Sequence, residues 1–249
     1  MLLELTSNST TEESSSNSSI IPNNSIEANT WVGTPDEFEA HVSEYYRCME
    51  TLTLRLLRIL AAACGLDPDF FTEKMSAHSS ILTLNHYPDL PPGSSELRVA
   101  EHTDVSMITI VAESGAGLQI LRPQEGGDST WMDIPHVPGA LVVNIGDCLA
   151  DWSEDRLRST RHRVVIPDSG GVSSHSSQSC RSSLAYFVTP RYDALMSPWP
   201  APTQGEESNV DVDIADNTDT GATFSEWRKR RVARAIKMLK TNPILWKSK

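Results

Sequence analysis

Two histidines and one aspartate are the residues of this chain best suited to do chemistry. His102 and Asp104 form a His-Thr-Asp triplet, and His162 follows far downstream, just ahead of Arg163-Val164. Two imidazole nitrogens and one carboxylate oxygen can occupy one face of a six-coordinate ferrous ion and leave the other positions open for chemistry. Zinc accepts the same donors. The residue types therefore predict a metal site without choosing between iron and zinc.

The strand pattern explains how these three residues could meet. Residues i and i+2 of a strand point to the same side, so His102 and Asp104 can both reach one ion from a strand end. His162 precedes the apolar run Val164-Val165-Ile166, which is typical of another strand. We therefore expect two distant strands to deliver the three ligands.

A second group of polar residues could bind an anion. Arg181 precedes the apolar segment 184–188 and should begin a strand, on which Ser183 shares its side. A guanidinium and a hydroxyl together can hold a carboxylate through charge-assisted hydrogen bonds. Tyr87 could donate a third hydrogen bond. The alternatives are a surface arginine in an ion pair and a half-buried strand tyrosine.

Short strand signals dominate the middle of the chain. Turn residues such as Gly126-Gly127-Asp128 and Pro138-Gly139 separate them. The predicted strands cover residues 81–85, 97–100, 107–112, 118–121, 131–134, 140–144, 163–166 and 184–188. This pattern predicts a closed or double-sheet all-β core.

One helix is predicted on each side of these strands. Thr34 and Glu37 should form a capping box that opens a long amphipathic helix, and Thr223 and Glu226 should open a basic one. The apolar stripe of the first helix is predicted to be Phe38, Val42, Tyr45, Met49, Leu52, Leu56, Ile59 and Ala63. The apolar side of the second is predicted to be Trp227, Val232, Ile236 and Leu239.

Composition narrows the possible partners. The 249 residues include 33 acidic and 21 basic side chains, for a net charge of −12, which argues against nucleic-acid binding as a main role. No apolar run reaches membrane-spanning length. The four cysteines lack the close spacings of a disulfide framework or a zinc-thiolate site, which favours a reducing compartment. We expect a cytoplasmic monomer with no nucleic-acid or membrane partner.

Taken in order, the motifs resemble one family. The chain is similar to the Fe(II)/2-oxoglutarate-dependent dioxygenases of the isopenicillin-N-synthase-like group, of which it looks like an amino-terminally short member. The likeness runs from about residue 80 to 192 and is weaker over 36–71. It rests on 84–88 (Leu-Asn-His-Tyr-Pro), 102–104 (His-Thr-Asp), 117–120 (Gly-Leu-Gln-Ile), Trp131, 142–147 (Val-Val-Asn-Ile-Gly-Asp), 152–153 (Trp-Ser), 158–160 (Arg-Ser-Thr), 162–164 (His-Arg-Val), Arg181-x-Ser183 and Phe187.

This resemblance implies a fold and a set of roles. It implies a mainly β protein with flanking helices, in which the strands form a double-stranded β-helix, or jelly roll. It implies that His102, Asp104 and His162 bind Fe(II). It further implies that Arg181 and Ser183 hold the distal carboxylate of the cosubstrate 2-oxoglutarate with help from Tyr87, and that Asn85 lies near the same pocket. Dioxygen and a small molecule would be the substrates, and ascorbate an activator.

The same features divide the chain into five segments. We expect a disordered Ser/Asn-rich segment over 1–30 and a helical remnant of the amino-terminal region over 31–78. The jelly-roll dioxygenase domain should occupy 79–193. A polar acidic linker over 194–222 and a carboxy-terminal helix over 223–249 should follow.

Four functions are compatible with this pattern. The first is a 2-oxoglutarate-dependent dioxygenase that hydroxylates, desaturates or cyclises a small molecule in secondary metabolism. The second is a truncated, non-catalytic jelly-roll remnant. The third is an oxidase of the isopenicillin-N-synthase type, in which the arginine-serine pair binds the substrate instead of 2-oxoglutarate. The fourth is a zinc hydrolase with the same three ligands.

Overall fold

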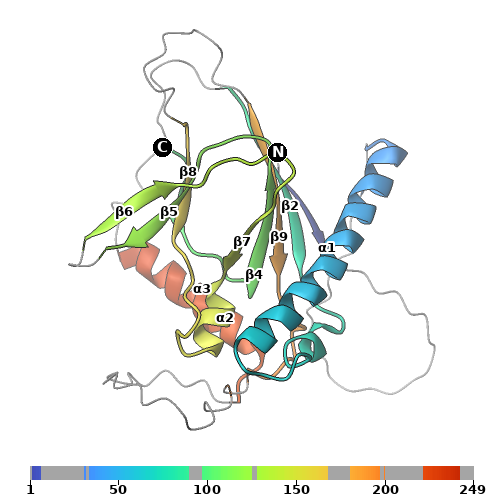
Figure 1. Cartoon of the computed structure of the whole chain (residues 1–249), viewed down its shortest axis with the longest axis vertical. Coiled ribbons are helices and arrows are strands. Elements are labelled where there is room, and N and C mark those ends of the chain that lie inside the picture. Colours follow the sequence, from blue (N-terminus) through green and yellow to red (C-terminus); the bar gives the residue numbers. More distant parts are fainter. Residues whose placement is uncertain are drawn as a thin grey trace.

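Two antiparallel sheets face each other in the computed structural model of the chain (Figure 1). The structure describes residues 2–6, 31, 34–89, 97–124, 128–167, 180–196, 199 and 221–241. Within these residues one sheet has the strand order β1-β2-β9-β4-β7 and the other the order β3-β8-β5-β6. The strands are β1 (Leu2–Thr6), β2 (Ile81–Tyr87), β3 (Leu97–His102), β4 (Ile108–Glu113), β5 (Leu118–Pro123), β6 (Ser129–Asp133), β7 (Val142–Ile145), β8 (His162–Val165) and β9 (Arg181–Val188).

The double-sheet core predicted from the sequence is confirmed. All eight predicted strands are present, with ends shifted by a few residues. Four helical elements accompany them, namely α1 (Asp36–Ala63), the 3₁₀ helix η1 (Thr72–Met75), α2 (Asp147–Trp152) and α3 (Phe224–Thr241). The sequence predicted α1 and α3 but neither α2 nor η1, because each is too short to show a helical period.

The predicted disorder of residues 1–30 needs one correction. Leu2–Thr6 forms β1, which pairs antiparallel with β2 from Leu2 opposite Asn85 to Thr6 opposite Ile81. An edge strand such as β2 would otherwise present a row of unpaired backbone groups, and β1 satisfies them. Residues 7–30 lie outside the described residues, as does most of the predicted linker over 194–222.

The central strands are buried on both faces, and this arrangement positions the site. Most odd-numbered residues of β2, β4 and β9 line a cavity between the sheets, whereas even-numbered residues near the middle of these strands belong to the apolar core that includes residues of α1. Leu82, Ile110 and Tyr186 are thus fully buried in the core beneath α1. Because side chains alternate along a strand, each of these strands separates a polar cavity from an apolar core.

Helix α1 covers the outer face of the five-stranded sheet (Figure 1). The predicted long amphipathic helix is confirmed, but its predicted capping box is wrong. The Thr34 hydroxyl donates to the Trp31 carbonyl at 2.8 Å, and Pro35 caps the helix without a side-chain bond. Val42 and Met49 of the predicted stripe are buried, but the prediction is wrong farther along the helix. Ile59 is 66% exposed, whereas Leu57 is fully buried.

Helix α3 packs through its first turn. The predicted capping box is confirmed, since the Thr223 amide donates to Glu226 Oε2 at 2.9 Å and the Glu226 amide donates to Thr223 Oγ1 at 3.3 Å. Trp227 is buried, but Val232 and Ile236 are exposed, so the predicted apolar side holds only near the start. None of the described helices is long and apolar enough to cross a membrane.

The packing of α1 can be tested by one pair of substitutions. Leu57→Ala should lower the free energy of unfolding by about 2–5 kcal/mol, because it leaves a cavity under a fully buried side chain. Ile59→Ala on the same helix should change it by less than about 0.5 kcal/mol. Urea denaturation followed by circular dichroism measures both. Equal losses for the two variants would contradict the described face of α1.

Candidate metal centre

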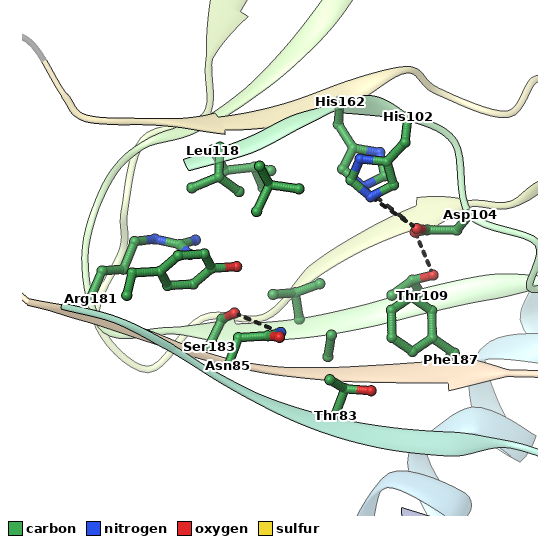
Figure 2. Close-up of a pocket in the computed structure, with 15 residues that line it drawn as sticks. Thr83, Asn85, His102, Asp104, Thr109, Leu118, His162, Arg181, Ser183 and Phe187 are labelled. Carbon is green, nitrogen blue, oxygen red and sulfur yellow. Dashed lines mark hydrogen bonds and ion pairs between the residues drawn. The ribbon is translucent and has the colours of Figure 1, made fainter. Parts of the chain in front are cut away.

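A cavity of about 300 Å³ lies between the two sheets and holds the polar residues singled out from the sequence (Figure 2). His102, Asp104 and His162 lie at one end, and Arg181 and Ser183 lie at the other. The wall includes apolar side chains such as Val111, Leu118 and Phe187. This volume falls at the small end of the range for ligand pockets, about 300–1,000 Å³.

The three predicted metal ligands converge on one point. His102 and His162 are direct partners across β3 and β8. Asp104 Oδ1 lies 3.7 Å from His102 Nε2 and 3.6 Å from His162 Nε2. One ligand atom from each residue lies within 4.8 Å of the other two, so the set could hold a metal ion. The other faces of such an ion would stay free for ligands from the cavity.

Backbone contacts fix the orientation of both imidazoles. His102 Nδ1 lies 2.8 Å from the carbonyl oxygen of Ala100, and His162 Nδ1 lies 3.0 Å from that of Thr160. A carbonyl can only accept, so each Nδ1 carries the proton and donates it. In the neutral imidazole this leaves the lone pair on Nε2, the nitrogen that lies nearest Asp104 Oδ1, and this tautomer can bind a metal through Nε2.

The carboxylate of Asp104 is held by one oxygen only. Its Oδ2 accepts hydrogen bonds from the Thr109 hydroxyl at 2.7 Å and from the Asn144 amide at 2.9 Å. Ser106 extends this chain with a 2.8 Å contact between its hydroxyl and that of Thr109. Oδ1 is left facing the two imidazoles, which favours coordination through that single oxygen. Thr109 and Asn144 are partners across β4 and β7, so the sheet register itself sets these two donors.

A second aspartate ties the ligand loop to the carboxy-terminal helix. The buried Asp147 accepts from the Thr103 hydroxyl at 3.0 Å and from two nitrogens of Arg231, at 3.1 Å and 2.6 Å, all at Oδ2. Its amide donates to the Asp104 carbonyl at 2.7 Å. Gly146 makes this approach possible, because an added Cβ there would lie 2.1 Å from the Ser106 carbonyl oxygen.

The anion-binding residues predicted from the sequence meet at the opposite end. Arg181 is paired with Tyr87, and Ser183 with Asn85, across β9 and β2. The guanidinium lies 5.1 Å from the centre of the Tyr87 ring in a cation–π arrangement, and Asn85 donates to the Ser183 hydroxyl at 3.4 Å. Within the described part of the chain, the buried Nη1 of Arg181 has no hydrogen-bond partner. Such an atom fits a cavity that receives a carboxylate.

Residues 78–190 match the family model of the 2OG-Fe(II) oxygenase superfamily. Residues 78–190 belong to this superfamily. The triad and the arginine–serine pair both lie inside the matched region. The resemblance to the Fe(II)/2-oxoglutarate-dependent oxygenases found in the sequence is therefore confirmed.

Relatives of this superfamily are similar over the same region. The chain is 32% identical to the 2-oxoglutarate-dependent dioxygenase htyE of Aspergillus rugulosus, over 69% of this chain and 54% of that protein. It is 35% identical to the proline hydroxylase buaE of Petromyces alliaceus, over 66% and 52%. The chain thus spans about half the length of the curated relatives it matches.

Solved structures agree with the fold. A full-length Neurospora crassa protein in complex with alpha-KG and 5-formyluracil superposes with a TM-score of 0.70 at 26% identity, over 94% of this chain and 68% of that chain. JOX2 in complex with 2OG, Fe and JA superposes with a TM-score of 0.60 at 26% identity, over 80% and 54%. The expected jelly roll is confirmed by these 2OG-Fe(II) oxygenase neighbours.

Sequence reasoning missed the residues that hold the site in place. The position of Thr109 could have been inferred, because it lies two residues from Val111 on the same strand and so points to the same side of the sheet. Asn144 and Asp147 were part of the recognised motif but were assigned no role. Arg231 carried no signal, since its contact with Asp147 spans 84 positions of the chain.

The carboxylate anchor can be tested without touching a ligand. Thr109→Val removes one of the two hydrogen bonds to Asp104 Oδ2, so the carboxylate should rotate more freely and the affinity for a divalent metal should fall by about 10–100-fold. Calorimetric titration with Mn(II) measures this change. Thr83→Val, the same change at another threonine of the cavity wall, should leave the affinity within about twofold. A loss of equal size in both variants would show that the hydroxyl of Thr109 has no special role.

The link to α3 makes a separate prediction. Arg231→Met removes two hydrogen bonds from Asp147, which should loosen the 102–104 loop and lower Co(II) affinity by about tenfold. The visible spectrum of the Co(II) protein should change as well, because it reports ligand geometry. Lys229→Met, at an exposed position of the same helix, is the matched control. An unchanged Co(II) spectrum in Arg231→Met would disprove the coupling.

Proposed function

We propose that the chain is an Fe(II)- and 2-oxoglutarate-dependent dioxygenase acting on a small organic molecule. His102, Asp104 and His162 bind iron in this proposal, and Arg181 and Ser183 bind the distal carboxylate of 2-oxoglutarate with Tyr87 and Asn85 beside them. One observation carries it: a single cavity has a metal-ligand triad at one end and a buried, unpaired guanidinium nitrogen of a described residue at the other.

The cavity wall matches the chemistry of 2-oxoglutarate. This molecule carries a 2-oxo acid at one end, a short methylene chain, and a second carboxylate at the other end. The triad suits the first end, the apolar side chains of Val111 and Leu118 suit the middle, and Arg181 with Ser183 suits the last. Iron with 2-oxoglutarate and dioxygen supplies the oxidising power, and succinate and carbon dioxide are released.

The protein's own role is to position and enclose the bound molecules. The strand register holds Arg181 and Ser183 on the cavity side of β9. The hydrogen bonds from Thr109 and Asn144 to Asp104 Oδ2 leave Oδ1 free. No nucleophile or general base is needed for such a reaction, which fits a cavity whose charged lining residues are the triad aspartate and Arg181. Hydroxylation, desaturation and ring closure are all compatible with this arrangement.

Other features of the proposal follow from the relatives and the composition. The names of similar proteins, such as proline hydroxylase buaE and validamycin A dioxygenase, support a role in secondary metabolism. The four cysteines are free, which supports a reducing, cytoplasmic location. We further propose a monomer activated by ascorbate.

The direct test is product stoichiometry. Purified protein with Fe(II), ascorbate, 2-oxoglutarate and candidate substrates should release one succinate per dioxygen consumed, and His102→Ala should abolish this release. A non-catalytic remnant would release none. A zinc hydrolase would work without dioxygen. An oxidase of the isopenicillin-N-synthase type would consume dioxygen without needing 2-oxoglutarate.

The role of Arg181 is tested by binding. Arg181→Ala should weaken 2-oxoglutarate by at least about tenfold, because a charge-assisted hydrogen bond contributes about 1.5–3 kcal/mol. Iron affinity should stay unchanged. The visible absorption band of the anaerobic ferrous protein with 2-oxoglutarate measures the binding. Arg58→Ala, which removes a surface arginine paired with Asp69, is the control. Equal 2-oxoglutarate affinity in Arg181→Ala and the parent protein would rule out this carboxylate site.

A further inference from the structure

Arg181 already has a carboxylate partner inside the protein. Its Nη2 donates to Glu113 Oε2 at 2.5 Å, and the two side chains are only 5% and 3% exposed. Its Nε donates to the Gly115 carbonyl oxygen at 3.0 Å. Nη1 is thus the guanidinium nitrogen that has no partner among the described residues.

The register of the sheet makes this pairing a built feature of the cavity. Glu113 is the direct cross-strand partner of Ser183 on β9, and Ser183 is the partner of Asn85 on β2. Glu113 also shares strand parity with Thr109 and Val111, which line the cavity. The carboxylate therefore lies on the same side of the sheet as the residues proposed to bind 2-oxoglutarate.

Two carboxylates at one guanidinium cannot act independently. Glu113 neutralises the charge of Arg181. A carboxylate that binds at Nη1 would be repelled by the carboxylate of Glu113, which is bound to the neighbouring Nη2. Attraction between opposite charges and repulsion between like charges are both stronger when the charges are shielded from water. A neutral acceptor at position 113 would orient the guanidinium equally well without this repulsion.

We propose that Glu113 is an internal counterion that sets the affinity and selectivity of the Arg181 end for carboxylates. It holds the arginine in its binding orientation and keeps the affinity for a second carboxylate lower than an uncompensated arginine would give. This inference rests on the proposed function, since it takes 2-oxoglutarate as the molecule that reaches Arg181. Glu113 acts through Arg181 and is a positioning residue.

The test compares two 2-oxo acids. 2-Oxoglutarate carries the second carboxylate, whereas 2-oxobutyrate has the same 2-oxo acid end without it. Glu113→Gln keeps the shape and the hydrogen-bond acceptor but removes the charge. The dissociation constant of 2-oxoglutarate should fall at least tenfold in this variant, and that of 2-oxobutyrate should stay within twofold. Titration of the anaerobic ferrous protein, followed by its visible absorption band, gives both constants.

Matched variants make the result specific. Asp69→Asn removes the same charge from the exposed Arg58–Asp69 pair and should leave both constants unchanged. Glu113→Asp keeps the charge but shortens its reach, so it should give an intermediate gain of about threefold for 2-oxoglutarate alone. If Glu113→Gln does not fold, Glu113→Asp still tests the proposal, because this variant retains the buried negative charge.

The possible outcomes separate this inference from the proposed function. If the parent protein binds 2-oxoglutarate but neither variant at position 113 changes its preference over 2-oxobutyrate, the counterion role is overturned and the dioxygenase proposal stands. Weaker 2-oxoglutarate binding in Glu113→Gln also overturns it. If the parent protein shows no band with either acid, the proposed function fails and the inference fails with it.

Discussion

The two oxygens of the Asp104 carboxylate do different things, and the site depends on that division. Thr109 and Asn144 hold one oxygen, and the other faces two imidazoles whose Nδ1 protons are already committed to backbone carbonyls. A carboxylate free to rotate would satisfy its own neighbours with either oxygen and would present no defined ligand. Strands β4 and β7 of one sheet and β3 and β8 of the other therefore cooperate to leave a single carboxylate oxygen available as a ligand.

The same division between protein and ligand appears at Arg181. One nitrogen is bound to a backbone carbonyl, one to Glu113, and one remains without a partner among the described residues. In both places the protein supplies hydrogen-bond partners for most atoms of a polar group and leaves one atom available to the cavity. Buried polar groups normally find partners, so a partnerless atom on a residue that lines a cavity is a candidate ligand-binding atom.

Much of this site could be predicted from local sequence. The cavity-side position of Ser183 follows from the two-residue period of a strand, and Asp104 lies just beyond the end of β3, as expected for a ligand at a strand end. The roles of Asn144 and Asp147 could not be predicted, because a hydrogen bond between strands depends on register. Arg231 meets Asp147 only after α3 has docked, and no local pattern encodes that contact. The buried face of α1 was predicted correctly at Val42 and Met49 but wrongly at Ile59, because the sequence does not distinguish an exposed isoleucine from a buried one.

Strand β9 separates the polar cavity from the core by the parity of its residues, and this has a consequence for how such a chain can evolve. Inserting one residue between Ser183 and Tyr186 would reverse the faces of one half of the strand, so that either Tyr186 would turn toward the cavity or Ser183 would turn toward α1. Inserting two would restore the faces but would move Arg181 about 7 Å along the strand. Insertions within β9 are therefore expected to be selected against. Differences in chain length between relatives should fall in the loops that connect the strands.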